Sequence, residues 1–266
     1  CLTIKQVFHH TVNRQRQIKV DPRSSENLGF TSSLTSFQSR LAWHCHFMQR
    51  LEAEATMDEV AINPELDELL NRQLDQRKFI AWRDGKTGWP FFDACMRYLA
   101  ATGWINFRMR AMLQSVASYT LWLPWQATGT HLANLFMDYE PGIHWSQVQM
   151  QSGVTGINSV RAYSVGKQST DHDPDGEFIR RWVPELSSVP AEHIHEPWLM
   201  TLVEQEQYNC RIGIDYPEPI VDEKAARKSG ISRSYKAKGD AAVKRRAKIV
   251  FDIHGSRSRQ SGRSRN

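Results

Sequence analysis

The sequence lacks the marks of several common protein classes. None of its 266 residues belongs to an apolar run long enough to cross a bilayer. Its four cysteines are widely spaced, which argues against a disulfide framework and against a zinc module. The HExxH, CxxC, GxSxG and P-loop patterns are absent as well. We therefore expect no membrane segment, no metal site, and a reducing compartment: the cytoplasm, or the nucleus if the source is eukaryotic.

Strand-like alternation and internal repeats are also missing, whereas apolar residues recur with a helical period. This period predicts helices over residues 3–19, 34–51, 64–80, 91–102, 104–123 and 131–139, the fourth of them closed by Gly103. The stretch "DYEPGIHWSQVQMQSG", residues 138–153, has neither period, so we expect an irregular loop there. The fold class that follows is all-α. Nine tryptophans suit either a large helical core or a planar ligand.

Charge is divided unevenly along the chain. Residues 221–266 hold 14 Lys and Arg against 4 Asp and Glu, while residues 1–220 hold 20 against 25. This division predicts a domain over 1–220 and a basic C-terminal tail over 221–266, partly helical or disordered. Two interpretations of the tail remain open, namely contact with a phosphate backbone and a solvated disordered end.

The expected loop carries two carboxylates and an imidazole, which first suggests a hydrolase. Hydrolysis needs a nucleophile with its base, or a metal, and neither is found. The histidine pairs at 44/46 and 193/195 are two residues apart, so on a helix they point to different faces. Asn106, Arg110 and Gln114, four residues apart, form instead one polar stripe on a helix. Asp138 is the expected ion-pair partner of Arg110 in that stripe.

Four segments in series carry a family resemblance: "AWRDGKTGWPFFDACMRYLAATGWINFRMR", "FMDYEPGIHW", "DPDGEFIRRWVPEL" and "YPEPIVD". Together they closely resemble the C-terminal helical flavin domain of the photolyase/cryptochrome family, over roughly residues 35–225. The resemblance implies a multi-helical domain that binds a U-shaped FAD. It also implies that the family's phosphate-cradling loop and its N-terminal antenna domain, with a possible antenna chromophore, precede residue 1.

The resemblance assigns cofactor-binding roles to Trp104, Asn106, Arg110, Asp138, Glu140 and His144. Arg110 matches the arginine beside the flavin, paired with Asp138. Glu140 stands where the family has an aspartate at the polar edge of the isoalloxazine. His144 falls where a family residue faces flavin N5, and there an imidazole can donate, accept or deliver a proton. Trp104 matches an aromatic position beside the flavin cavity.

Catalytic roles are implied for Trp125, His144 and Trp43, and substrate or DNA contacts for Arg40, Trp43 and Met150. Trp125 matches the middle tryptophan of the family's electron path. Several positions depart from the family pattern: the flavin-proximal tryptophan is Val148, the outer one is Arg72, and the family's asparagine falls on Phe107. Pocket residues of the family are replaced at Arg40, His44, Ala111 and Met150.

Three hypotheses on function follow from the resemblance. The first is a photolyase-type lyase, in which excited reduced FAD donates an electron to a pyrimidine lesion flipped out of UV-damaged DNA. The second is a cryptochrome-like blue-light photoreceptor without repair activity, with a signalling partner at the C-terminal tail. The third is a degenerate fragment without flavin. We expect a monomer with no membrane partner.

Overall fold

The computed structural model describes residues 2–21 and 29–255. Within these residues the chain forms no β-strand, and a single isolated bridge joins Ile212 to Tyr216. The all-α fold class is therefore confirmed. None of the described helices is both long and apolar enough to cross a bilayer. Cys45, Cys95 and Cys210 are free thiols, while Cys1 lies outside the described residues.

The chain divides into two compact units, residues 1–55 and 56–266. The first unit is a pair of helices, α1 (Ile4–Val20) and α2 (Phe30–Ala53), that pack against each other. Thr3 starts α1 with a capping box, in which its side chain accepts from the backbone of Gln6 while the Gln6 side chain accepts from the backbone of Thr3. Gln38 of α2 donates to Thr11 and Gln15 of α1.

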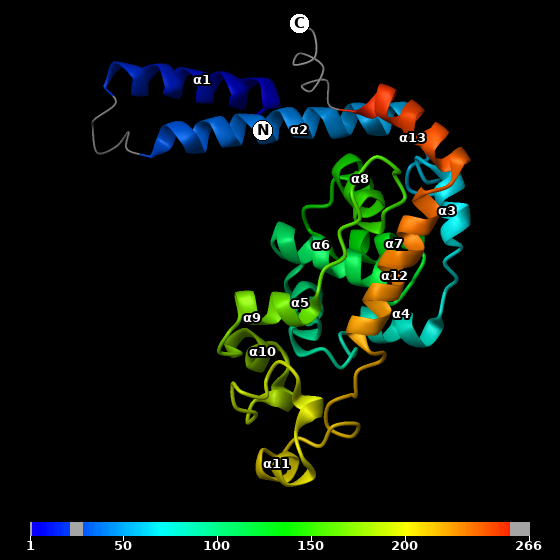
Figure 1. Ribbon diagram of the computed structural model, residues 1–266. Coiled ribbons are helices and arrows are strands. Elements are labelled where there is room, and N and C mark those ends of the chain that lie inside the picture. The colour runs from blue at the N-terminus through cyan, green and yellow to red at the C-terminus, as the bar shows by residue number, and fades with distance from the viewer. Residues whose placement is uncertain (1, 22–28, 256–266) are drawn as a thin grey trace, which may run out of the picture. The chain divides into compact units, whose positions relative to one another are not determined.

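The second unit holds the remaining elements (Figure 1). Its α-helices are α3 (Pro64–Leu70), α4 (Gln76–Arg83), α5 (Pro90–Thr102), α6 (Phe107–Ser115), α7 (Trp125–Leu135), α8 (Pro141–Ser152), α9 (Val165–His172), α10 (Glu177–Trp182), α11 (Leu202–Gln207), α12 (Glu223–Lys238) and α13 (Ala241–His254). The π-helical turn η1 (Val116–Thr120) continues α6, and η2 (Pro184–Leu186) and η3 (Pro197–Leu199) are 3-10 turns.

Helix α5 lies at the centre of the second unit because its sequence is apolar on nearly every side. Phe92, Met96 and Leu99 are completely buried, and the helix contacts α4, α6, α9 and α10. Pro90 occupies the first turn, where a missing N–H costs nothing, and Gly103 ends the helix in the left-handed region at φ 70°. The predicted end of this helix at Gly103 is confirmed.

Two predictions about local structure are wrong. Residues 138–153 are not an irregular loop, because α8 occupies Pro141–Ser152 between a proline in its first turn and a left-handed Gly153. Helix α8 shows no amphipathic period because it is buried on several sides and places polar residues inside, Gln149 and Ser152 among them. The predicted helix over 64–80 is also broken, since Asn71 turns the chain at φ 43° between α3 and α4.

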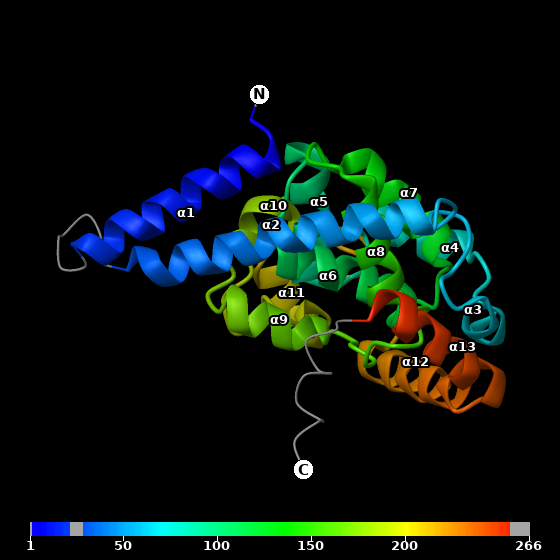
Figure 2. The same cartoon turned by 90° about the horizontal axis from the view of Figure 1, so that it is seen from above.

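Helices α12 and α13 are packed against the second unit (Figure 2). Helix α12 contacts η1 and α3, and α13 contacts α3 and α12. A Cβ atom on Gly230 would lie 1.9 Å from the carbonyl oxygen of Tyr119, so only glycine allows this approach. Much of the segment predicted as a basic tail is therefore helical, while residues 256–266 lie outside the described part. The domain boundary at 220 stays a prediction.

Candidate flavin-contacting face

An ion pair between Arg110 of α6 and Asp138 of the α7–α8 connection marks the candidate site. Arg110 Nη2 lies 2.9 Å from Asp138 Oδ2, which confirms the pairing expected from the sequence. Arg110 Nε also donates to the carbonyl of Ile105 at 2.7 Å, and the guanidinium lies 4.2 Å from the ring centre of Phe136. Two hydrogen bonds and one ring contact thus fix its plane.

The rest of the polar stripe on α6 is hydrogen-bonded through Asn106 Oδ1 and Gln114 Nε2, while the buried Oε1 of Gln114 has no hydrogen-bond partner among the described residues. Asn106 is the N-cap of α6, where its Oδ1 accepts from the backbone of Met109 at 3.1 Å. At the buried end, the Gln114 amide nitrogen lies 2.9 to 3.1 Å from the hydroxyls of Ser118, Thr128 and Ser152. The stripe therefore runs from an exposed cap, through the ion pair, to a buried hydroxyl cluster.

Exposed apolar side chains stand close to Arg110 and Asp138 in the sequence. Trp104, Phe107, Met137 and Tyr139 are 47%, 65%, 79% and 42% exposed. Met137 lies against Gly103, because a Cβ atom there would meet Met137 Cγ at 2.4 Å and Met137 N donates to the Gly103 carbonyl. We call these four residues with Arg110 and Asp138 the α6–α8 face. It combines flat apolar groups with charged donors and acceptors, as a planar heteroaromatic ligand requires.

His144 lies in the first turns of α8 with its imidazole ring buried. Its Nε2 lies 2.9 Å from the carbonyl oxygen of Gly129 on α7, so Nε2 carries the proton and donates it to that carbonyl. Edge-on contacts to Phe136, Tyr139 and Trp145 surround the ring. Burial lowers the pKa of His144 to about 4, and the neighbouring positive charge of Arg110 adds to the shift. The imidazole is therefore neutral at pH 7.

A pair of tryptophans continues inward from His144. The rings of His144 and Trp145 are 4.9 Å apart, and those of Trp145 and Trp125 are 6.1 Å apart in an edge-to-face arrangement. Trp125 is completely buried, and its indole N–H donates to Asp67 Oδ2 at 3.1 Å. The indole of Trp145 donates to the hydroxyl of Tyr139 at 3.1 Å. Aromatic rings are thus in close succession from α8 to α7.

The other residues named from the sequence lie at separate places. Glu140 is half-buried at the N-cap position of α8, and Met150 is half-buried in its last turns. Arg40 and Trp43 belong to the first unit, where they line an open hollow of about 830 Å³ along α2. Within the described residues, no group of three or more His, Cys, Asp or Glu side chains is arranged to hold a metal.

Sequence reasoning missed three partners that define the face. The Gly129 carbonyl fixes the tautomer of His144, Phe136 lies against the Arg110 guanidinium, and Asp67 accepts from Trp125. A backbone carbonyl leaves no sequence signal, and Asp67 is 58 residues away from Trp125. Only Phe136 had a usable signal, because it stands two residues before Asp138 at the apolar end of α7.

An all-helical unit with a charged, aromatic-rimmed face is what we expect of a helical cofactor-binding protein. Comparisons with known proteins identify the family. Residues 37–236 match the family model described as the FAD binding domain of DNA photolyase. This match covers well over half of the chain. The chain therefore belongs to that photolyase/cryptochrome family, and FAD is the cofactor of its domain.

Individual relatives carry both names used in this family. The chain is 37% identical over 149 residues to Cryptochrome DASH of Gloeobacter violaceus, covering 56% of this chain and 30% of the relative. It is 36% identical over 165 residues to a deoxyribodipyrimidine photo-lyase of Alkalihalophilus pseudofirmus, covering 61% and 34%. The chain thus spans about a third of the length of these curated relatives.

A solved structure agrees on the fold. A bacterial class III photolyase from Agrobacterium tumefaciens aligns with a TM-score of 0.74 at 24% identity, covering 90% of this chain and 48% of that one. At this identity the likeness shows the helical fold alone.

Proposed function

We propose that the α6–α8 face holds the isoalloxazine of FAD and that the longer protein uses blue light to repair pyrimidine lesions in DNA. The observation that carries this proposal is the Arg110–Asp138 ion pair, oriented by Ile105 and Phe136 and rimmed by exposed aromatic rings. A guanidinium held flat beside a carboxylate suits the polar edge of a flavin, whose carbonyl and imide groups need both donors and acceptors.

The residues of the face fit the cofactor in number and kind. Within the face, Arg110 supplies N–H donors, Asp138 supplies an acceptor, and Trp104 supplies a flat apolar ring; next to it in the sequence, Asn106 adds a donor and Glu140 an acceptor. Bound FAD supplies one-electron chemistry and absorbs blue light. The protein's contribution is to hold the ring, keep water from it, and fix its hydrogen bonds.

His144 has a restricted role in this proposal. Since Nε2 donates to the Gly129 carbonyl, the remaining nitrogen, Nδ1, bears a lone pair and accepts rather than donates. With its pKa lowered to about 4 by burial, the imidazole does not deliver a proton at pH 7. We therefore assign His144 to accepting a hydrogen bond near the flavin.

The aromatic pair gives the proposal an electron path. Val148 stands at the family's flavin-proximal tryptophan position, so Trp145, 6.1 Å from Trp125, takes its place in the path. Asp67 then accepts the indole proton of Trp125 when that ring is oxidised. The roles of Arg40, Trp43 and Met150 at the DNA lesion rest on the family resemblance. An antenna chromophore belongs to a preceding domain, and the protein acts as a monomer.

The alternative is a cryptochrome-like photoreceptor without repair activity. The observation that favours it is the neutral, buried His144, since this residue would not deliver a proton to a bound flavin at pH 7. In that case a partner protein reads a change at α12 and α13, which extend beyond the family match at residue 236.

One experiment separates these functions. The full-length protein is purified, its flavin absorbance is recorded, and the reduced protein is illuminated with DNA that contains pyrimidine dimers or other UV lesions. Loss of lesions only in the light supports repair. Flavin photoreduction without repair of any lesion supports the photoreceptor, and absence of flavin from full-length protein refutes both. Trp145→Phe should slow photoreduction, whereas Trp198→Phe, on η3, is the matched control.

A further inference from the structure

Helices α12 and α13 form a helical hairpin, residues 223–254, that has a net positive charge, whereas the chain before it has a net negative charge. This hairpin carries ten Lys and Arg against three Asp and Glu, whereas residues 1–222 carry 20 against 26. The hairpin has a net charge of +7 on a molecule that is otherwise acidic. Such a separation of charge concentrates positive potential on one surface.

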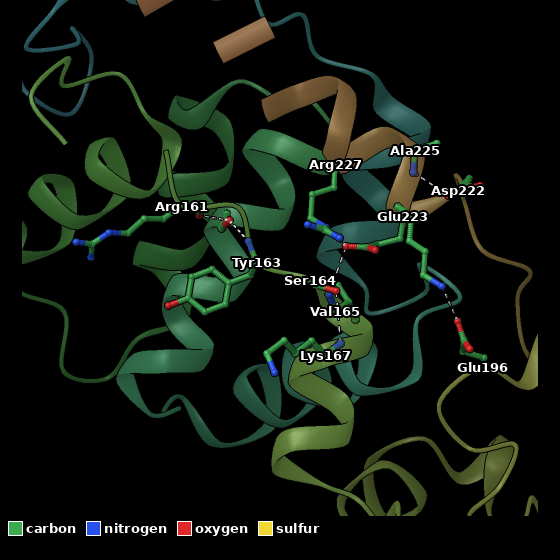
Figure 3. A network of polar contacts seen from close by, with 12 residues as sticks. Arg161, Tyr163, Ser164, Val165, Lys167, Glu196, Asp222, Glu223, Ala225 and Arg227 are labelled. Carbon is green, nitrogen blue, oxygen red and sulfur yellow. Dashed lines mark hydrogen bonds and ion pairs between the residues drawn. The ribbon is translucent and has the colours of Figure 1, made fainter. Parts of the chain in front are cut away.

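The hairpin is fixed to the second unit rather than free. Gly230 lies against the Tyr119 carbonyl, and Asn63 donates to the Val243 carbonyl at 3.2 Å. At the start of α12, Glu223 accepts from the backbone of Val165 at the start of α9 (Figure 3). The charges are therefore presented from a fixed backbone, with little conformational entropy left to lose on binding.

Half of the basic side chains serve the fold. They contact acceptors or a ring of the second unit: Lys224 with Glu196, Arg227 with Glu223, Arg233 with the ring of Trp122, Lys238 with the Asn158 carbonyl, and Arg246 with the Ile62 carbonyl. Two of these pairs are drawn in Figure 3. The remaining five are exposed and form no ion pair with any described residue: Lys228, Lys236, Lys244, Arg245 and Lys248.

On α12 the exposed charges share a face with hydroxyl groups. Ser232, Tyr235 and Lys236 lie four, seven and eight residues after Lys228, which is the spacing of one helix face. Tyr235 is 57% exposed. On α13, Lys244 and Lys248 are again four residues apart. We call the five unpaired cations with Ser232 and Tyr235 the hairpin surface.

We propose that the hairpin surface binds the phosphate backbone of a nucleic acid, independently of the α6–α8 face. Cations and hydroxyl groups are the main protein contacts to phosphate oxygens. Helix α6 and the turn η1 form one continuous helix that connects the two sites. Arg110 lies near the start of α6, and α12 packs on η1, where this continuous helix ends. The 14 residues of α6 and η1 span about 20 Å. A duplex carries roughly one phosphate charge per 1.7 Å, so the five cations of the hairpin surface can contact several phosphates of one duplex.

On α12 the hairpin surface suits nucleic acid better than an anionic membrane, whereas α13 also exposes Ile249, Phe251 and Ile253, which a bilayer would accept. An interfacial helix inserts an apolar face between lipids. The side of α12 opposite its charges is already buried, with Gly230 and Ser234 against the second unit. Helix α12 therefore has no apolar face left for a bilayer, and its one exposed aromatic residue, Tyr235, carries a hydroxyl group.

The test compares two triple variants of the full chain that lose the same charge. The first is Lys228→Gln, Lys236→Gln, Lys248→Gln in the hairpin surface. The control is Lys86→Gln, Lys167→Gln, Arg181→Gln, three exposed cations elsewhere in the second unit. Binding of a fluorescent, undamaged duplex is measured over a range of salt concentrations. The hairpin variant should lose about tenfold or more in affinity at low salt, and its salt slope should fall by roughly three.

The outcomes decide the proposal separately from the flavin function. If the control variant loses as much as the hairpin variant, or if neither loses affinity, the proposal is wrong. Phosphatidylserine vesicles provide a second arm, and charge-dependent binding to vesicles but not to the duplex also overturns it. Flavin absorbance is recorded for each variant, because it should be unchanged by the hairpin substitutions. Loss of the flavin function alone leaves this result standing.

Discussion

The molecule holds two carboxylates in opposite ways, Asp138 on the α6–α8 face and Asp93 inside α5. Asp138 has its side chain half exposed and forms an ion pair with Arg110 at 2.9 Å. Asp93 is completely buried and accepts four hydrogen bonds, from Thr87 N and Oγ1, Gly88 N and Tyr216 Oη. The fully satisfied carboxylate holds the fold together, while the partly satisfied one retains capacity for a ligand. An exposed group that is held in place but still has hydrogen-bond acceptors to spare, as Asp138 has, thus marks the functional region.

The largest effect is expected at the buried carboxylate. Asp93→Ala leaves two backbone N–H groups and the Tyr216 hydroxyl without an acceptor inside the core, which should cost about 3–5 kcal/mol of unfolding free energy. Urea unfolding measures this loss. Asp175→Ala, an exposed aspartate in the loop before α10, is the control and should cost little. A loss below about 1 kcal/mol at Asp93 would contradict its structural role.

The next effect depends on pH. Burial holds the pKa of His144 at about 4, below its ordinary value of 6.5, so the unfolded chain takes up this proton first as pH falls. The contribution of His144 to stability should therefore be fully present above pH 6.5 and decrease toward pH 4, by up to about 3 kcal/mol. Burial raises the pKa of Asp93 to about 6, which acts in the opposite sense over the same range, so the effect of His144 is read as the difference between variant and parent. His144→Asn should flatten this part of the stability profile, measured by thermal unfolding. The exposed His172→Asn variant should keep the slope. An unchanged profile in His144→Asn would show that another group causes it.

A smaller effect sharpens the account of Asp93. Tyr216→Phe removes one of its four donors and keeps the ring, so unfolding should become easier by about 1–2 kcal/mol. Tyr98→Phe is the matched control, because the Tyr98 ring contacts Phe178 and Trp182 without needing its hydroxyl. If Tyr216→Phe adds nothing to an Asp93→Asn background, the two residues act as one unit.

Of these substitutions, Asp138→Asn should change the stability of the fold least and the affinity for FAD most. Asp138→Asn breaks a solvent-exposed ion pair and should cost at most about 1 kcal/mol of stability. If the pair orients Arg110 toward the flavin, affinity for FAD in the full-length protein should fall about 10–100-fold, measured by fluorescence titration. Asp171→Asn breaks the exposed pair with Lys167 and is the control. Equal FAD affinity in both variants would remove the α6–α8 face from the cofactor site.

The sequence predicted what local patterns determine. The all-helical class, the end of α5 at Gly103 and the pairing of Arg110 with Asp138 follow from period, glycine and charge, and all three are confirmed. Helix α8 shows no amphipathic period, and only Pro141 and Gly153, a start and a stop signal, mark it in the sequence. A helix that buries Gln149 between the carbonyls of Met57 and Val60 cannot show an apolar stripe.

Other features depend on distant contacts that no local pattern encodes. Tyr216 reaches Asp93 across 123 positions, and the acceptor of His144 is a backbone carbonyl of another helix. The break between α3 and α4 required a left-handed Asn71, which is rarer than a continued helix. The flavin roles of Trp104, Asn106 and Glu140 stay predictions until a bound cofactor is observed.

Because Gly230 approaches the Tyr119 carbonyl closely, α12 packs directly on the rest of the second unit, and α13 packs on α12. Helix α12 rests on η1, and η1 is the direct continuation of the helix that carries Arg110. One added methyl group at position 230 would clash with the Tyr119 carbonyl and displace α12 from η1. Such a displacement would act on η1 and on α6, the helix that carries Arg110, so the identity of residue 230 bears on the position of that arginine.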